Sequence, residues 1–510
     1  MKNLSRIWAF TVLAILFGPG SCTQPANEEL PDFRNVVLLI GDDHSTRVLG
    51  CYGNEQIHTP NLDRMAAGGS RFARAFANAP LCSASRQSLL TGRYPHAAGV
   101  TLLRTSFPEE QYTLAEHLLG QGFRTGVIGK THFNNGGSHG FETVVGRQDW
   151  QEQLEKHPPK VVPDSIAVRP QWKPFRDPAR IWLNAETLPG GYYDADITGT
   201  FYAEQAQSFI QEHQDERFLL WVGFHEPHSP FNFPVEDQGR YQAEEMKLPP
   251  TSPEDDRWIP AVFKDLNEEE QQGIVAAYYH SVEHLDKNVG LILNQIESLG
   301  LTEETLVIYL GDHGYLLGDH KRFEKHMMWE PAVNAPLIIQ AGGRYGKGQV
   351  VNGLTEFVDV VPTVLEALGV PAMERTQGSS LIPVLEKPRS PHKTAIFSEF
   401  LADHKAMIRT DRWKYVYTTG DRDLGQGYAT GLAPPGVTHR LYDVVADPYE
   451  MQDLSSLPAH QDTLQSLKGE LLQWFEQTHP NASEVPQGLS LEEQLAWFCI
   501  PPEGEQPDAK

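Results

Sequence analysis

Two clusters of polar residues have the composition of a metal site. Asp42 and Asp43 directly follow an apolar run and a glycine, and so do Asp312 and His313. Adjacent carboxylates suit a hard divalent cation such as Ca²⁺, which takes several oxygen ligands. His313 adds a nitrogen ligand, so another divalent metal stays open as an alternative. Aspartates are also common in turns and helix caps, and either cluster alone would more often be structural.

Two further apolar runs are followed by lysine and histidine residues. Lys130 and His132 follow the first, His225 and His228 follow the second, and Lys325 comes later in a charged stretch. A single lysine or histidine is usually a solvated or satisfied residue. Together, these types suit binding of an anionic group by ammonium ions and proton transfer by imidazole.

The apolar runs before these clusters predict the elements that position them. Each is a continuous stretch typical of a strand buried on both faces, and they are Val36–Ile40, Thr125–Ile128, Phe218–Phe224 and Leu306–Leu310. Segments with helical spacing lie between them, including 114–119 and 278–296. This alternation predicts an α/β doubly wound sheet. Ligands bind beyond the carboxyl ends of strands in such sheets, so we expect the clusters to converge on one site.

The stretch Cys82-Ser83-Ala84-Ser85-Arg86 opens a segment that we expect to form a helix ended by Gly92. Taken alone, Cys82 would more often be a small buried residue with an inert thiol. The stretch and the trailing Leu89-Leu90-Thr91-Gly92-Arg93 resemble the type I sulfatase signature, C-x-P/A-x-R followed by L-x-T-G-R. The polar clusters occur in the family's order, and the resemblance runs roughly from Asn35 to Leu454.

The resemblance implies a nucleophile at position 82. In that family the cysteine is oxidised before folding to formylglycine, whose hydrate attacks the sulfate ester. Attack on sulfur releases the alcohol and leaves sulfate on residue 82, and the second hydroxyl of the hydrate then expels it. The resemblance also implies a formylglycine-generating maturation enzyme as a partner. A bound divalent metal, expected to be Ca²⁺, polarises the sulfate.

Roles for the other residues follow from the same resemblance. The expected metal ligands are Asp42, Asp43, residue 82, Asp312 and His313. Arg86 is expected to fix the hydrate, and His132 to act as the base in its collapse. Sulfate binding is expected from Lys130 and Lys325, substrate contact from His225, and protonation of the leaving oxygen from His228, with Lys325 assisting.

The same resemblance implies an alkaline-phosphatase-like fold and a sulfated carbohydrate substrate. The segment His225-Glu226-Pro227-His228 looks somewhat like that of the iduronate-sulfatase and sulfamidase branches, which points to glycosaminoglycans. We therefore expect a catalytic domain at 32–388 with a large, mostly parallel sheet between helices. A smaller subdomain at 389–485 is expected to hold a short antiparallel sheet and one helix, followed by a polar tail at 486–510.

The N-terminus predicts export. Residues 1–22 combine a basic start with an apolar run that is too short to span a bilayer, as in a signal peptide. Cys22 follows small residues, so lipidation of Cys22 and an ordinary cleaved signal are two open alternatives. Either one predicts an exported protein, in the periplasm or as an outer-membrane lipoprotein of a bacterium. Pairing of Cys51 with Cys499 also stays open.

The composition restricts the class of partner. The net charge of −25 argues against nucleic acid or an anionic membrane surface as the main partner. Two other functions remain as alternatives to a sulfatase. One is a phosphonate or phosphate ester hydrolase of the same superfamily, and the other is a surface glycan-binding lipoprotein whose Cys82 is never converted.

Overall fold

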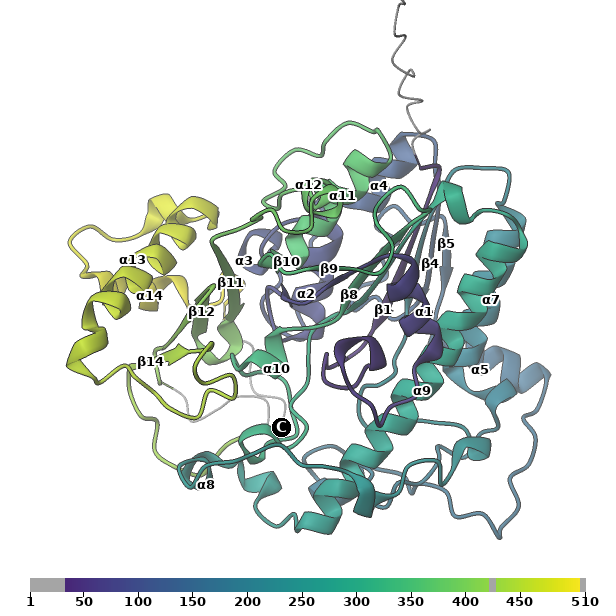
Figure 1. The fold of residues 1–510 in the computed structure, drawn as a ribbon, viewed down its shortest axis with the longest axis horizontal. Helices are drawn as coiled ribbons and strands as arrows, with labels where there is room; N and C mark the ends of the chain where they lie inside the picture. Colours follow the sequence, from purple (N-terminus) through teal and green to yellow (C-terminus); the bar gives the residue numbers. More distant parts are fainter. Residues whose placement is uncertain (1–32, 422–427, 505–510) are drawn as a thin grey trace, which may run out of the picture. The chain divides into compact units, whose positions relative to one another are not determined.

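The computed structural model describes residues 33–421 and 428–504 (Figure 1). The expected signal peptide and Cys22 lie outside the described residues. A mixed sheet of eight strands forms the centre of the described chain, in the order β5-β4-β6-β1-β7-β8-β2-β9. Their bounds are β1 Asn35–Gly41, β2 Ser70–Phe72, β4 Arg124–Gly129, β5 Thr143–Val145, β6 Phe218–Gly223, β7 Thr305–Gly311, β8 Leu337–Ala341 and β9 Gln349–Val351.

The four central strands are the four that the apolar runs predicted, and they are parallel to one another. β8 is antiparallel to both β7 and β2, so the sheet is mostly but not wholly parallel. The ends of the central strands lie in register, since Gly41 pairs with Gly311, Ile40 with Gly223, and Gly129 with Gly223. The polar residues that follow these strands therefore start from one edge of the sheet, as expected.

Helices cover both faces of this sheet (Figure 1). Alternate side chains of β1 separate the two cores, with Val36 and Leu38 in one and Val37 and Leu39 in the other. The first core is closed by α2 Cys82–Thr91, α4 Leu114–Gly120, α11 Val360–Ala367 and α12 Ile382–Glu386. The second is closed by α1 Pro60–Gly68, α7 Thr198–Glu212 and α9 Glu268–Ser298. The expected sandwich of helices around the sheet is thus confirmed.

Helix α2 has the predicted bounds, and each of its residues is buried. Gly92 ends it in the left-handed region at φ 66°. A side chain at this position would be strained by the backbone and would also lie 3.0 Å from Cβ of Val361. Gly92 therefore lets α2 stop close to α11, while its first residue, Cys82, lies at the polar edge of the sheet.

The C-terminal part forms a second, antiparallel sheet with the order β11-β12-β13-β14. The strands are β11 Ala395–Phe400, β12 Lys405–Thr410, β13 Trp413–Thr418 and β14 Thr438–Asp443. α13 Gln461–Thr478 packs against them, as expected for the single helix of this subdomain. The segment expected as a polar tail contains a further helix, α14 Leu491–Phe498, which buries Leu495 and Phe498 in the same core.

The last described residues bind back to the catalytic part. The Glu503 carboxylate accepts hydrogen bonds from the backbone N–H groups of Thr101, at 2.6 Å, and of Leu102, at 3.1 Å. The hydroxyls of Thr101 and Thr105 donate to the same carboxylate. The loop at 101–105, which follows the short helix α3 Pro95–Ala98, is therefore fixed by a residue near the C-terminal end of the described chain.

The structure answers the question of cysteine pairing that the sequence left open. Cys51 and Cys499 are free, so they do not pair. Within residues 33–421 and 428–504, no helix combines the length and apolar character needed to cross a bilayer.

Candidate active site

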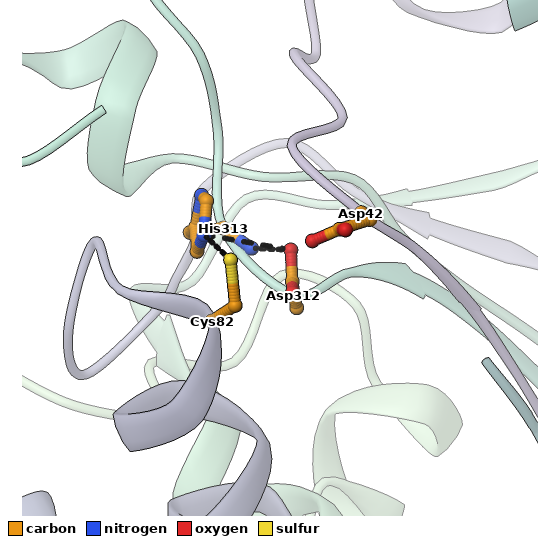
Figure 2. Close-up of side chains that lie close together, drawn as sticks. All are labelled: Asp42, Cys82, Asp312 and His313. Carbon is orange, nitrogen blue, oxygen red and sulfur yellow. Dashed lines mark hydrogen bonds and ion pairs between the residues drawn. The ribbon is translucent and has the colours of Figure 1, made fainter. Parts of the chain in front are cut away.

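Four side chains from three separate elements point toward one another at the edge of the large sheet (Figure 2). Asp42 follows β1, Cys82 begins α2, and Asp312 and His313 follow β7. One potential ligand atom from each lies within 4.8 Å of the others, and all four residues are buried. A second group, Asp43, Cys82 and His228, meets the same distance limit. The convergence expected from strand order is therefore present.

Backbone hydrogen bonds hold these loops together. The N–H of Asp312 donates to the carbonyl of Gly41 at 2.9 Å, and the N–H of Asp42 donates to the carbonyl of Glu226 at 3.0 Å. The N–H of Asp43 donates to Oδ1 of Asp312 at 3.0 Å. The three loops after β1, β6 and β7 therefore position one another, which fixes the carboxylates before any ligand binds.

The thiol of Cys82 lies between cationic and anionic groups. Its Sγ is 3.2 Å from Nζ of Lys325, 3.3 Å from Nε2 of His313 and 3.8 Å from Oδ1 of Asp43. Burial raises the pKa of the thiol far above its usual value, and the Asp42 charge adds to this effect. An unmodified Cys82 is therefore a protonated thiol at neutral pH and a weak nucleophile.

Three cations neutralise the three buried carboxylates. Lys130 pairs with Asp42, Nζ of Lys325 lies 2.6 Å from Oδ1 of Asp43, and Nε of Arg86 lies 2.8 Å from Oδ2 of Asp312. Burial raises the pKa of the Asp42 carboxyl, but the charges of Lys130, His228 and Arg86 outweigh it and hold the pKa well below its ordinary value. The Asp42 carboxylate is thus ionised and available as a ligand.

The donor set fits a divalent metal. Oδ1 of Asp42 is buried and has no hydrogen-bond donor among the described residues. Nδ1 of His313 lies 2.9 Å from the Gly314 carbonyl, which assigns the proton to Nδ1 and leaves the lone pair of Nε2 facing the cluster. Carboxylate oxygens with one imidazole nitrogen suit Ca²⁺ or a related divalent ion.

Histidines line the more open side of the cluster. His132, His225 and His228 are only partly buried. Nδ1 of His228 lies 2.7 Å from the Ser229 carbonyl, and its Nε2 lies 3.8 Å from Oδ2 of Asp43. Burial lowers the pKa of all three imidazoles, and Lys130 lowers that of His225 further, to about 3. Burial therefore disfavours the charged form of these rings, and the carboxylates of Asp43 and Asp42 oppose this effect at His228.

The sequence did not identify several residues that support the site. The Tyr278 hydroxyl, from α9, donates to the Asp43 carbonyl at 2.5 Å and accepts from the Ser45 N–H at 2.8 Å. The Ser85 hydroxyl donates to the Asp312 carbonyl. For Ser85, only its position within the Cys82–Arg86 stretch indicates a functional role. Tyr278 lies in a segment with helical spacing, where an aromatic residue is typical of the core.

Comparison with known proteins identifies related chains. Residues 34–370 match the sulfatase family, and residues 318–477 match the family described as N-sulphoglucosamine sulphohydrolase, C-terminal. An N-acetylglucosamine-6-O-sulfatase of Bacteroides thetaiotaomicron is 27% identical, over 91% of this chain and 90% of the relative. An ulvan-active sulfatase of Formosa agariphila is 26% identical, over 91% of this chain and 85% of the relative.

Solved structures share the fold. A phosphonate monoester hydrolase of Agrobacterium radiobacter superposes with a TM-score of 0.74 at 22% identity, covering 87% of this chain and 96% of that one. A protein crystallised with its substrate, D-glucosamine-2-N,6-O-disulfate, superposes with a TM-score of 0.70 at 22% identity, covering 89% of this chain and 100% of that one. At this identity, the likeness concerns the architecture alone.

Proposed function

The chain belongs to the sulfatase family and is an enzyme of that class, and from this premise we propose that it hydrolyses sulfate esters of carbohydrates with residue 82 as the nucleophile. The observation that carries the proposal is the convergence of Cys82 with three buried carboxylates, His313 and three cations at one edge of the sheet. A buried anionic ligand needs such a concentration of positive charge and hydrogen-bond donors.

Conversion of Cys82 to formylglycine is the first part of the proposal. A protonated thiol in this environment is a weak nucleophile, which supports the need for conversion. The hydrate supplies one hydroxyl that attacks sulfur and a second that, once deprotonated, releases sulfate. In the structure, Sγ of Cys82 marks the position of the attacking oxygen, 3.2 Å from Nζ of Lys325.

A divalent metal, expected to be Ca²⁺, is the second part. Asp42, Asp43, Asp312 and His313 would hold it together with residue 82. Oδ1 of Asp42 supports this assignment, because it has no hydrogen-bond donor among the described residues and lies 3.8 Å from Nη2 of Arg86. When bound, the metal polarises the sulfate oxygens and lowers the pKa of the attacking hydroxyl. Lys130 and Lys325, which pair with Asp42 and Asp43 in this structure, would bind sulfate oxygens.

The remaining polar residues have roles in holding and moving protons. Nε of Arg86 donates a hydrogen bond to Oδ2 of Asp312, while Nη2 has no hydrogen-bond acceptor among the described residues. The guanidinium group can therefore donate from Nη2 to the hydrate at position 82. His228 donates a proton to the leaving oxygen, assisted by Lys325, and His132 accepts one from the second hydroxyl. His225 contacts the substrate.

The substrate class follows from the relatives. Two that match most of this chain are named for carbohydrate substrates, N-acetylglucosamine 6-O-sulfate and ulvan. The C-terminal match to the sulphoglucosamine sulphohydrolase family supports glycosaminoglycan fragments in particular. The N-terminal sequence supports export to the periplasm or, with a lipid on Cys22, to the outer membrane.

Two measurements test this function. Mass spectrometry of the tryptic peptide 75–86 from protein of its native source should find an aldehyde or its hydrate at position 82. The purified protein should hydrolyse 4-nitrophenyl sulfate faster than 4-nitrophenyl phosphate. Faster hydrolysis of the phosphate ester would favour a phosphonate or phosphate ester hydrolase. An unmodified thiol at position 82 in folded, exported protein would favour a glycan-binding lipoprotein.

A further inference from the structure

One buried histidine beside the catalytic cluster is not among the proposed catalytic residues. His326 directly follows Lys325, whose Nζ lies 3.2 Å from Sγ of Cys82. The N–H of His326 donates to the carbonyl of Pro80 at 3.3 Å, and the carbonyl of His326 accepts from Nζ of Lys405 at 3.3 Å. The backbone of His326 is therefore tied to the segment that leads into Cys82.

The conformation of His326 is held from several sides. Its φ of 63° lies in the left-handed region, which residues other than glycine rarely adopt. Its ring is 6% exposed and stacks on the ring of Phe400, with the centres 4.9 Å apart and the planes at 16°. The Tyr428 ring packs nearby, with its centre at 5.3 Å. The imidazole of His326 is thus fixed in one orientation by its backbone and its aromatic neighbours.

Both nitrogens of this ring lack a hydrogen-bond partner among the residues that the structure describes. His96 is also buried, but its Nδ1 lies 2.7 Å from Oε2 of Glu399 and its Nε2 lies 3.0 Å from Oγ1 of Thr478. A buried imidazole without partners is unfavourable unless a ligand supplies them. The strained backbone and the unused ring nitrogens of His326 are together typical of a residue that binds a ligand.

The ring lies within electrostatic reach of three side chains of the catalytic cluster. Burial lowers the pKa of His326 well below its ordinary value, and the charges of Lys325 and His313 lower it further. His228, on the more open side of the cluster, has a smaller effect in the same direction. The imidazole of His326 is therefore neutral and lies beside the site of ester cleavage.

A neutral imidazole suits a different group from the other residues of the site. It offers one N–H donor and one acceptor nitrogen, which match a hydroxyl group, since a hydroxyl both accepts and donates. A sulfate ester offers only acceptor oxygens, and Lys130 and Lys325 are the expected donors to them. A sugar that carries a sulfate ester also carries free hydroxyls near that ester. The hydrogen-bonding capacity of His326 therefore suits the sugar rather than the sulfate.

We propose that His326 hydrogen-bonds a free hydroxyl of the sugar, beside the ester that is cleaved, and thereby selects sugar sulfates over sulfates that lack this hydroxyl. The inference rests on the proposed function and deepens it by naming a specificity-determining residue. The chemical step, which residue 82 performs, does not depend on His326.

Two substrate types separate this role from a structural one. The first is the sugar that the parent protein hydrolyses fastest among N-acetylglucosamine 6-sulfate, N-acetylgalactosamine 4-sulfate and iduronate 2-sulfate. The second is 4-nitrophenyl sulfate, which has no hydroxyl. His326→Phe keeps an aromatic ring against Phe400 and removes both nitrogens. It should lower kcat/KM about tenfold for the sugar and less than twofold for 4-nitrophenyl sulfate, since one hydrogen bond to the sugar is lost.

Two further variants serve as controls. His326→Asn keeps a neutral donor and acceptor on a residue that tolerates positive φ, so it should lose less activity on the sugar than His326→Phe does. His139→Phe is the matched control, because His139 is buried, has a φ of 44° and packs against Phe107 and Phe133. It should leave the ratio of kcat/KM for the two substrates unchanged. Melting temperatures establish that each variant is folded.

Deoxy analogues of the sugar identify the hydroxyl. Among analogues that each lack one free hydroxyl, one should lose about tenfold in kcat/KM with the parent protein. The same analogue should lose less than twofold with His326→Phe, because the contact is already absent there.

Several outcomes overturn the inference. One is an equal loss on the sugar and on 4-nitrophenyl sulfate in His326→Phe, and another is no loss on either. A parent protein that tolerates the loss of every hydroxyl also overturns it, even if His326→Phe does not fold. If the parent protein releases sulfate from no ester, the proposed function fails instead. Calorimetry of the same sugars with Cys82→Ala protein, with and without His326→Phe, then decides the inference, and equal affinities overturn it.

Discussion

Two buried clusters of this molecule contain the same residue types but differ in how completely their atoms are hydrogen-bonded. One is the catalytic cluster around Asp42, Asp43 and Asp312. The other, which we call the inner ion cluster, contains Glu356, Asp359 and Lys393 below the C-terminal sheet. Every carboxylate oxygen of the inner ion cluster accepts two hydrogen bonds or ion-pair contacts, from Asn78, Tyr94, Ser379, His392, Lys393 and the N–H groups of Glu356 and Phe397.

The catalytic cluster lacks this completeness. Oδ1 of Asp42 and Nη2 of Arg86 are buried without hydrogen-bond partners among the described residues, and they lie 3.8 Å from each other, beyond hydrogen-bond distance. Buried polar atoms are rarely left unsatisfied in a purely structural cluster, since each one costs stability. These two clusters therefore differ in the hydrogen-bond capacity that is left unused, and not in charge or burial.

The largest expected effect is that of Cys82→Ala. Removing the nucleophile should lower kcat/KM for a sulfate ester about 10³-fold or more, while stability falls by only about 1 kcal/mol, as expected for the loss of one buried thiol. The matched control is Cys499→Ala, because Cys499 is also fully buried but lies in the C-terminal core. That variant should lose about 1 kcal/mol of stability and keep its activity. Comparable activity in both variants would contradict the role of residue 82.

The inner ion cluster should respond in the opposite way. Lys393→Met leaves two buried carboxylates without their shared cation, which should destabilise the protein by about 3–5 kcal/mol in urea unfolding. Activity per folded molecule should be preserved. Lys325→Met is the counterpart in the catalytic cluster, and it should instead abolish most activity. If Lys393→Met reduces kcat more than stability, the distinction between the clusters is wrong.

Metal removal should affect only the catalytic cluster. Treatment with a chelator should lower the melting temperature, and Ca²⁺ at about 100 times its Kd should restore about 2.7 kcal/mol. Ca²⁺ should stabilise the Lys393→Met protein by the same amount, because Lys393 does not contact the proposed metal ligands. Differential scanning calorimetry of both proteins with and without Ca²⁺ checks this, and no shift in either would argue against a bound divalent metal.

The smallest expected effect concerns a histidine outside both clusters. Burial, with a contribution from His96, lowers the pKa of His479 to about 3. The unfolded chain takes up this proton at about pH 6.5, so folding stability falls as the pH falls from there toward 3. His479→Phe should remove at most about 2 kcal/mol of the loss between pH 6.5 and 4.5, measured by urea unfolding. An unchanged pH profile would mean that His479 is protonated in the folded protein.

Much of this arrangement was predictable from the sequence. The apolar runs gave the four central strands because buried parallel strands need apolar residues on both faces. Their order and common polar edge then placed Asp42, Asp312 and His313 near Cys82. Gly92 identified the end of α2 because few other residues adopt its backbone conformation.

Other features depend on contacts that local patterns do not encode. Tyr278 binds the loop of Asp43 only because α9 packs against the sheet, and its spacing in the chain matches that of a core residue. The segment that contains α14 was expected to be polar because Pro, Gln and Glu are frequent around it, yet five of the eight residues of α14 are apolar and pack in or against the C-terminal core. The inner ion cluster likewise combines residues that are far apart in sequence, so its hydrogen bonds could not be counted in advance.

The contact of Glu503 with the loop at 101–105 has a consequence for the timing of biosynthesis. Cys82 is 1% exposed in the folded protein, so the maturation enzyme that we propose would reach its sulfur only before the chain has folded. About 420 residues separate Cys82 from Glu503. At about 5–20 residues per second, the ribosome takes about 20–80 s to add them. The hydrogen bonds between Glu503 and the loop at 101–105 therefore cannot form until translation is nearly complete.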